Sequence, residues 1–204
     1  KKCIVIAAVL VAGIVQAGII ENYQLGGQLA SRDKAWNQPT VGSTYDIVSA
    51  TDPQLVFTVT AVANNGDTLV LGSNFLSADS SARQTDTHLS RISDDESITV
   101  TVSYVDPNNS LISLKVKEFG AFWGNNATET TVFTDASANS YNLIGFNHNA
   151  PETLIDYSTT GLDALTKDNT GTWSMTASAD HTLGTTTSGF GGFELEYDVV
   201  PEPA

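Results

Sequence analysis

Alternating apolar and polar residues dominate the chain and predict β-strands. The clearest case is residues 190–200, FGGFELEYDVV, in which every second residue from 193 to 199 is apolar and the residues between are acidic. Successive side chains of a strand point to opposite faces. The stretch is therefore predicted to be an antiparallel strand with one buried face and one acidic, wet face.

The same alternation occurs over residues 96–105 and 111–122. Asp106-Pro107-Asn108-Asn109 separates them and predicts a turn, so a hairpin at 96–122 is expected at the centre of a sheet. Asn64-Asn65-Gly66-Asp67 predicts a second, tighter hairpin. Shorter β-branched runs predict strands at 45–49, 54–62, 67–72, 130–134, 140–146, 153–157 and 170–178.

About ten short strands separated by turn residues predict an all-β fold, an antiparallel two-sheet sandwich resembling a jelly roll, over residues 45–200. Residues 18–44 are expected to be irregular. Residues 73–95 are expected to form a functional loop or a short helix, and residues 159–167 are the best helical fragment. The predicted core comprises Phe57, Val59, Val100, Val102, Leu114, Val116, Phe193, Leu195 and Tyr197.

The N-terminus has the three-part layout of a secretory signal peptide, residues 1–17. Lys1-Lys2 precede an almost wholly apolar run, Cys3 to Val15, and small residues lead to a predicted cleavage after Ala17. The run is short for a membrane span. A pilin-type N-terminal helix is the rival interpretation, but polar and glycine residues at 21–27 interrupt the apolar pattern early.

The last strand runs into Val200-Pro201-Glu202-Pro203-Ala204, where two prolines end the β ladder. This ending resembles the start of the PEP-CTERM sorting signal of exported bacterial proteins. The resemblance covers residues 200–204 only and does not include the apolar segment and basic tail of the family. It implies sorting through Pro201, Glu202 and Pro203 by a membrane protease, then residence at the cell surface or in the extracellular matrix, often with exopolysaccharide.

The net charge and the cysteine content limit the classes of partner and of chemistry that are expected for this chain. The formal net charge is -14 and the isoelectric point is near 4.2, a field that repels phosphate backbones, so nucleic acid is not an expected partner. Cys3 is the single cysteine and would leave with the signal peptide, which excludes disulfides and thiolate chemistry in the mature chain.

Calcium is the one cofactor that the sequence suggests. Carboxylate, amide and backbone oxygens suit this ion, and secreted β-sandwiches often hold one. The candidates are the cluster Asp94-Asp95-Glu96, just before a strand, and Asp106 with Asn108 in a turn. Ordinary solvated turns remain the alternative.

Tryptophans suggest a polysaccharide as a partner, since an aromatic ring can stack on the apolar face of a sugar. Trp123, followed by Gly124 and the amides Asn125 and Asn126, lies at a predicted strand end, and Trp36 lies in the irregular segment. Trp173 alternates with Met175 and is expected in the core.

The leading functional hypothesis is an exported surface or matrix protein without catalytic activity, which meets the membrane only through its signals and contacts export and sorting machinery. A carbohydrate-binding module is the alternative. A polysaccharide hydrolase is the third and least favoured hypothesis. It would need two facing carboxylates in a cleft, and no such pair stands out in the sequence. The sequence also contains no nucleophile-elbow or phosphate-binding motif.

Overall fold

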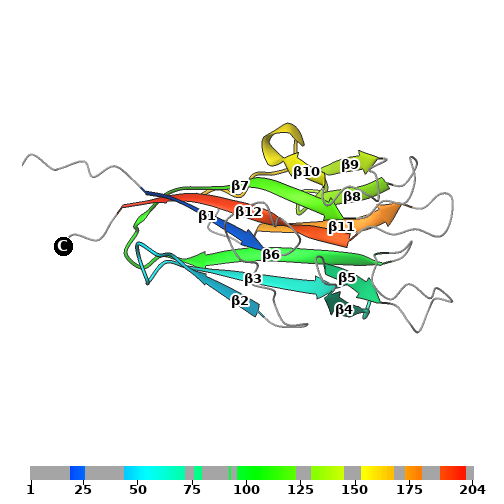
Figure 1. The fold of residues 1–204 in the computed structure, drawn as a ribbon, viewed down its shortest axis with the longest axis horizontal. Coiled ribbons are helices and arrows are strands. Elements are labelled where there is room, and N and C mark those ends of the chain that lie inside the picture. The colour runs from blue at the N-terminus through cyan, green and yellow to red at the C-terminus, as the bar shows by residue number, and fades with distance from the viewer. Residues whose placement is uncertain are drawn as a thin grey trace, which may run out of the picture.

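The computed structural model places most of the residues that it describes in two packed β-sheets (Figure 1). The described residues are 19–25, 44–71, 76–79, 92, 96–122, 130–144, 153–167, 173–180 and 189–200. Every strand pairing among them is antiparallel, and their helical content is one 3-10 turn, η1 (Tyr157–Thr159). The predicted all-β, antiparallel two-sheet sandwich is confirmed.

Each sheet has six strands. Sheet A contains, in spatial order, β10 (Thr153–Asp156), β7 (Leu111–Phe122), β12 (Gly189–Val199), β5 (Leu76–Asp79) and β4 (Thr68–Leu71), with β1 (Ile19–Leu25) also paired to β12. Sheet B contains, in spatial order, β2 (Thr44–Val48), β3 (Val56–Ala63), β6 (Ser97–Val105), β11 (Trp173–Asp180), β8 (Thr130–Asp135) and β9 (Ser140–Ile144).

The core lies between the inner faces of the two sheets. All nine predicted core residues are buried, and Leu195 has no exposed surface. Aromatic rings from the two sheets contact each other in this core. The ring centroids of Phe57 on β3 and Tyr197 on β12 are 4.6 Å apart. The ring centroids of Phe119 on β7 and Phe133 on β8 are 4.5 Å apart. The alternation read from the sequence therefore identifies the inward-facing side chains correctly.

Both predicted hairpins are wrong. Strands β6 and β7, expected as partners, lie at central positions of different sheets, and β3 and β4 are likewise split between the sheets. The turn at 64–67 does form: Asn65 and Gly66 have φ of 59° and 80°, and the Asp67 amide donates to the Asn64 carbonyl at 3.0 Å. Turn residues determine where the chain reverses direction. Whether the two strands then pair within one sheet or pack against each other in opposite sheets depends on how their apolar faces are buried.

Three irregular or helical predictions are corrected. Residues 18–44 include strand β1, and residues 73–95 include strand β5 and the fully buried Ile92, so the first described strand begins at Ile19, well before residue 45. Residues 160–166 are not helical; η1 precedes them, and Leu162 and Leu165 anchor this segment in the core. Long-range burial overrides weak local helix propensity here.

The first and last described strands are neighbours. Strand β1 pairs with β12 from Ile19↔Val199 to Leu25↔Phe193. We name the proximal end of the sandwich the one that holds Ile19, Val199 and the loops 49–55 and 106–110. The far end holds Phe122, which pairs with Gly189. Both ends of the described chain thus leave the sandwich at its proximal end (Figure 1).

The core assignment predicts a large effect of truncating Leu195 on β12. Leu195→Ala should lower the free energy of unfolding by about 2–5 kcal/mol, because it removes transfer energy and leaves a cavity between the sheets. Ile112→Ala, at an exposed position on the neighbouring β7, is the control and should change it by at most about 0.5 kcal/mol. Denaturant titration of both variants checks this, and equal losses would contradict the assignment.

Candidate functional site

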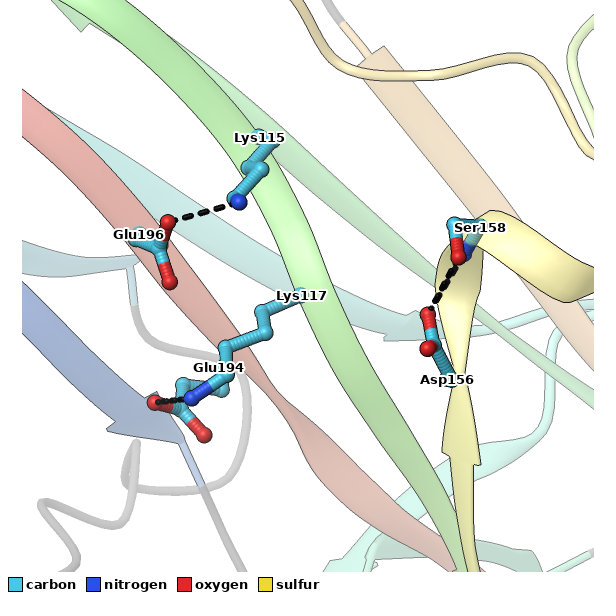
Figure 2. Close-up of polar contacts among 6 residues, drawn as sticks. All are labelled: Lys115, Lys117, Asp156, Ser158, Glu194 and Glu196. Carbon is cyan, nitrogen blue, oxygen red and sulfur yellow. Dashed lines mark hydrogen bonds and ion pairs between the residues drawn. The ribbon is translucent and has the colours of Figure 1, made fainter.

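The outer face of sheet A carries two lysine–glutamate ion pairs (Figure 2). Lys115 Nζ on β7 lies 2.6 Å from Glu196 Oε1 on β12, and Lys117 Nζ lies 3.4 Å from Glu194 Oε1. The lysines are about half exposed, whereas the two glutamates are mostly covered. The face therefore presents lysine ammonium groups over partly buried carboxylates.

An irregularity in the ladder builds this arrangement. Glu194 pairs with Glu118 and Leu195 with Val116, which leaves Lys117 as an additional residue on β7. A bulge of this kind re-aims a side chain, and here Lys117 reaches Glu194. The prediction of a fully wet acidic face on β12 is wrong at Glu194, which is only 5% exposed.

Asp156, at the end of β10, belongs to the same face (Figure 2). It accepts hydrogen bonds from the Ser158 hydroxyl at 2.7 Å and from the Ser158 amide at 2.9 Å. The pKa of Asp156 lies below its usual value. The hydrogen bond from the Ser158 hydroxyl lowers it most, followed by the bond from the Ser158 amide, and the positive charge of Lys115 adds a smaller effect. A mixed face of lysines, carboxylates and a hydroxyl suits hydrogen bonding to a polar ligand.

A second polar cluster closes the proximal end. The Glu21 carboxylate on β1 accepts from Tyr197 Oη at 2.7 Å, Ser49 Oγ at 3.2 Å, the Ala50 and Thr51 amides at 3.0 Å each, and the Thr51 hydroxyl. Glu21 thus ties sheet A to the loop that follows β2 of sheet B. Burial raises the pKa of this carboxyl, but the hydrogen bonds outweigh burial and the pKa is lowered overall.

The residues predicted to bind calcium at this end make hydrogen bonds within the protein. Asp106 accepts from the Ser110 amide and hydroxyl and from the Leu111 amide, at 2.9–3.1 Å. Asn108 Nδ2 donates to both carboxylate oxygens of the fully buried Asp52. The pKa of Asp52 is lowered, mainly by the Ser110 hydroxyl, whose single proton Asp52 shares with Asp106.

A third cluster, which the sequence analysis missed, fastens residues 157–167 to sheet B. The buried Asp135 accepts from the Ser137 and Asn139 amides at 2.9 Å and from the Asp163 amide at 2.6 Å. Burial raises the pKa of Asp135, but these bonds lower it overall. Asp135 precedes a short turn to β9, a weak local signal, but its partner Asp163 lies 28 residues away.

The Asp163 carbonyl accepts from Tyr157 Oη at 2.8 Å and from Trp173 Nε1 at 3.1 Å. Burial raises the pKa of Tyr157 to about 12. Trp173 is buried, as predicted, and its polar atom has a partner, as buried tryptophans normally do. This cluster therefore has a structural role.

Several predicted site residues lie outside the described residues: Trp36, Asp94, Asp95, Trp123, Asn125, Asn126, Pro201, Glu202 and Pro203. Of the others, Glu96 is buried just before β6, whereas Asp106 and Asn108 lie together in the loop before β7. Within the described ranges, no three acidic, histidine or cysteine side chains are grouped so that they could hold a metal ion. Calcium binding stays a prediction.

The comparisons with known proteins give no relative: no family model, curated protein or solved structure matches the chain. Among the described residues, no helix has the length and hydropathy needed to cross a membrane. Function is therefore inferred from the sequence and the geometry.

The Glu21 cluster predicts a pH-dependent contribution to stability. Because the folded pKa of Glu21 lies below its ordinary value of 4.5, its contribution should be complete above pH 4.5 and be lost as the pH falls through the lowered value. Glu21→Gln should therefore lower the denaturation midpoint at pH 7 and flatten its fall between about pH 5 and pH 3, an interval set by these pKa directions.

Asp46→Asn on β2 is the matched control, because this exposed carboxylate accepts a hydrogen bond from the Thr58 hydroxyl and joins no cluster between the sheets. Its urea midpoints should follow the wild-type profile. A Glu21→Gln profile parallel to wild type across this range would show that Glu21 does not stabilise the folded state through its charge.

Proposed function

We propose that this protein is an exported β-sandwich without catalytic activity that resides at the cell surface or in the extracellular matrix, in association with exopolysaccharide. The observation that supports this most is the Ile19↔Val199 pair at the proximal end. The sandwich occupies the interval between the predicted signal peptide and the predicted sorting signal, and its first and last strands are adjacent.

The described strands lie between the two predicted signals. Strand β1 begins at Ile19, two residues after the predicted cleavage site at Ala17, and β12 ends at Val199, two residues before Pro201. Neither signal supplies a described strand. A protein that is first held by its ends and later released needs this separation of the folded unit from its signals.

The composition and the charged face fit an extracellular setting. The chain has a single cysteine, so no disulfide within it supports the fold, and the core and polar clusters must suffice. The high negative charge favours solubility. The ion pairs of Glu194 and Glu196 favour a binding or structural role over hydrolysis.

Localisation in the native cells tests the proposal. The exported protein should begin at Gly18 and be recovered from the surface or medium. Replacing Pro201, Glu202 and Pro203 together by alanine should retain it in the envelope fraction, since the sorting motif is lost. Pro53→Ala, in an exposed loop position, is the control and should be released normally. Protein that stays in the cytoplasm with Lys1 still attached would contradict the proposal.

A carbohydrate-binding role is the second candidate, supported by where the strands end. Phe122, the residue before Trp123, pairs with Gly189 at the far end of the sandwich. A glycan site at residues 123–126 would therefore be attached to the end opposite the two predicted signals. Such a site would stay accessible while the proximal end is held at the envelope.

A polysaccharide array tests this candidate. Trp123→Ala, and separately Trp36→Ala, should weaken binding by about tenfold or more if the ring is a stacked anchor, which is typically worth ~2 kcal/mol. Ile144→Ala, an exposed aliphatic position on β9, is the control and should bind like wild type. Absence of saturable binding to any polysaccharide removes the candidate. Release of reducing ends that Glu194→Gln abolishes would instead indicate a hydrolase.

A further inference from the structure

Exposed aliphatic side chains are concentrated at the proximal end. Seven large hydrophobic residues among the described part of the chain are exposed, at 42–63% of their surface. Two of them, Val62 and Ile144, lie toward the far end. The other five lie at the proximal end, and we name them the aliphatic collar: Ile20, Val48, Val105, Ile112 and Val200.

The collar includes both outer faces of the sandwich. On sheet B, Val48 pairs with Val56 and Val56 with Val105, so three valines form a row across β2, β3 and β6. These residues alternate with buried ones, such as Ile47 and Phe57, which places the row on the outer face.

On sheet A, Ile20 pairs with Asp198 beside the last residues of β12. Ile112 is the second residue of β7, whose first residue, Leu111, pairs with Val199. The Val200 amide donates to the Ser110 carbonyl at 2.9 Å, which holds Val200 against the loop before β7. The same short section of the sandwich is thus aliphatic on two opposite faces.

Three carboxylates at this end, those of Asp52, Asp106 and Glu21, have hydrogen-bond partners within the protein, whereas Oδ1 of Asp198, the residue that pairs with Ile20, is buried without one in the described part of the chain. Asp52 is fully buried and bonded to Asn108, and Asp106 accepts three hydrogen bonds from its own loop. Glu21 is likewise held between β1 and the loop at 49–51. An apolar environment could approach this end without leaving these three charges without partners.

The number of residues between the apolar run of the predicted signal peptide and β1 indicates which surface the collar contacts. The apolar run of the predicted signal ends at Val15, and Ile20 follows five residues later. Five extended residues span at most about 18 Å. While that run lies in a bilayer, the proximal end is therefore held within a short distance of the lipid surface, and so is the collar.

We propose that the aliphatic collar rests in the interfacial layer of a lipid bilayer while the chain is held there by its signals. This inference depends on the proposed function, because the signals bring the collar to the membrane. Apolar side chains of interfacial elements enter this boundary by roughly 5–10 Å. The collar orients the sandwich upright, with the far end directed away from the lipid.

Brominated lipids test the proposal on the full chain. Val105→Trp places a fluorophore in the collar, and Val62→Trp is the matched control, an exposed valine on the outer face of the same sheet but toward the far end. Each variant is added to phosphatidylcholine vesicles with brominated acyl chains, and emission of the wild-type tryptophans is subtracted. The emission added by Val105→Trp should shift to shorter wavelength and lose intensity, whereas the emission added by Val62→Trp should do neither.

The outcomes separate the two proposals. Vesicle binding without quenching at position 105, or with equal quenching at position 62, overturns the collar proposal and leaves the signals intact. Absence of vesicle binding by the full chain also overturns the collar proposal, whereas the proposed function is overturned only by the localisation experiment. A dimer in solution that Val105→Thr dissociates, with no quenching at position 105, would assign the collar to a second copy of the chain and also overturn the proposal.

Discussion

The pairing of β1 with β12 is the constraint on which the rest of the structure depends. Strand β12 has neighbours on both edges, β7 on one side and β1 with β5 on the other, and its inner face is fully buried. It is therefore the strand around which sheet A assembles. Because the pairing is antiparallel, Ile19 and Val199 lie side by side, and the start of the first described strand and the end of the last share one end of the sandwich.

The polar clusters connect strands and loops of the two sheets, in addition to the contacts made by the hydrophobic core. Glu21 connects β1 and β12 with the loop after β2, and Asp52 connects that loop with the loop before β7. Asp135 fastens the segment after β10 to sheet B. In each cluster a covered carboxylate accepts several backbone or side-chain donors, as such groups must when they leave water. A chain with one cysteine can in this way join its two sheets and loops without a disulfide.

The sequence predicted the fold class because a two-residue period survives in the central strands. Residues 98–102 and 193–199 show it plainly, and the predicted core was confirmed in full. Strand pairing could not be predicted, since residues 106–109 indicate a turn without indicating which sheet the next strand joins. Strand β1, IIENYQL, lacks alternation and is recognisable only through its partner; Glu21 bonds to a tyrosine 176 residues away.

The candidate sites were less predictable for the same reason. The collar residues come from five separate places in the chain, and only the fold brings them to one end. The Lys117–Glu194 ion pair depends on a β-bulge in β7, which no residue pattern in the sequence indicates. Single residues with suggestive chemistry, such as Asp106, looked like ligands from sequence but take hydrogen bonds from their own loop. Long-range register decides these outcomes.

A disulfide between β1 and β12 tests the central claim most directly. With Cys3 replaced by serine, Ile20→Cys and Asp198→Cys form a directly opposed pair, whose Cβ atoms should lie about 4.5–5.5 Å apart. Under mild oxidation this pair should form a disulfide rapidly, whereas Ile20→Cys with Glu194→Cys, four residues along the same face, should not. Failure of the first pair to close, or equal closure of both, would contradict the pairing on which the account is built.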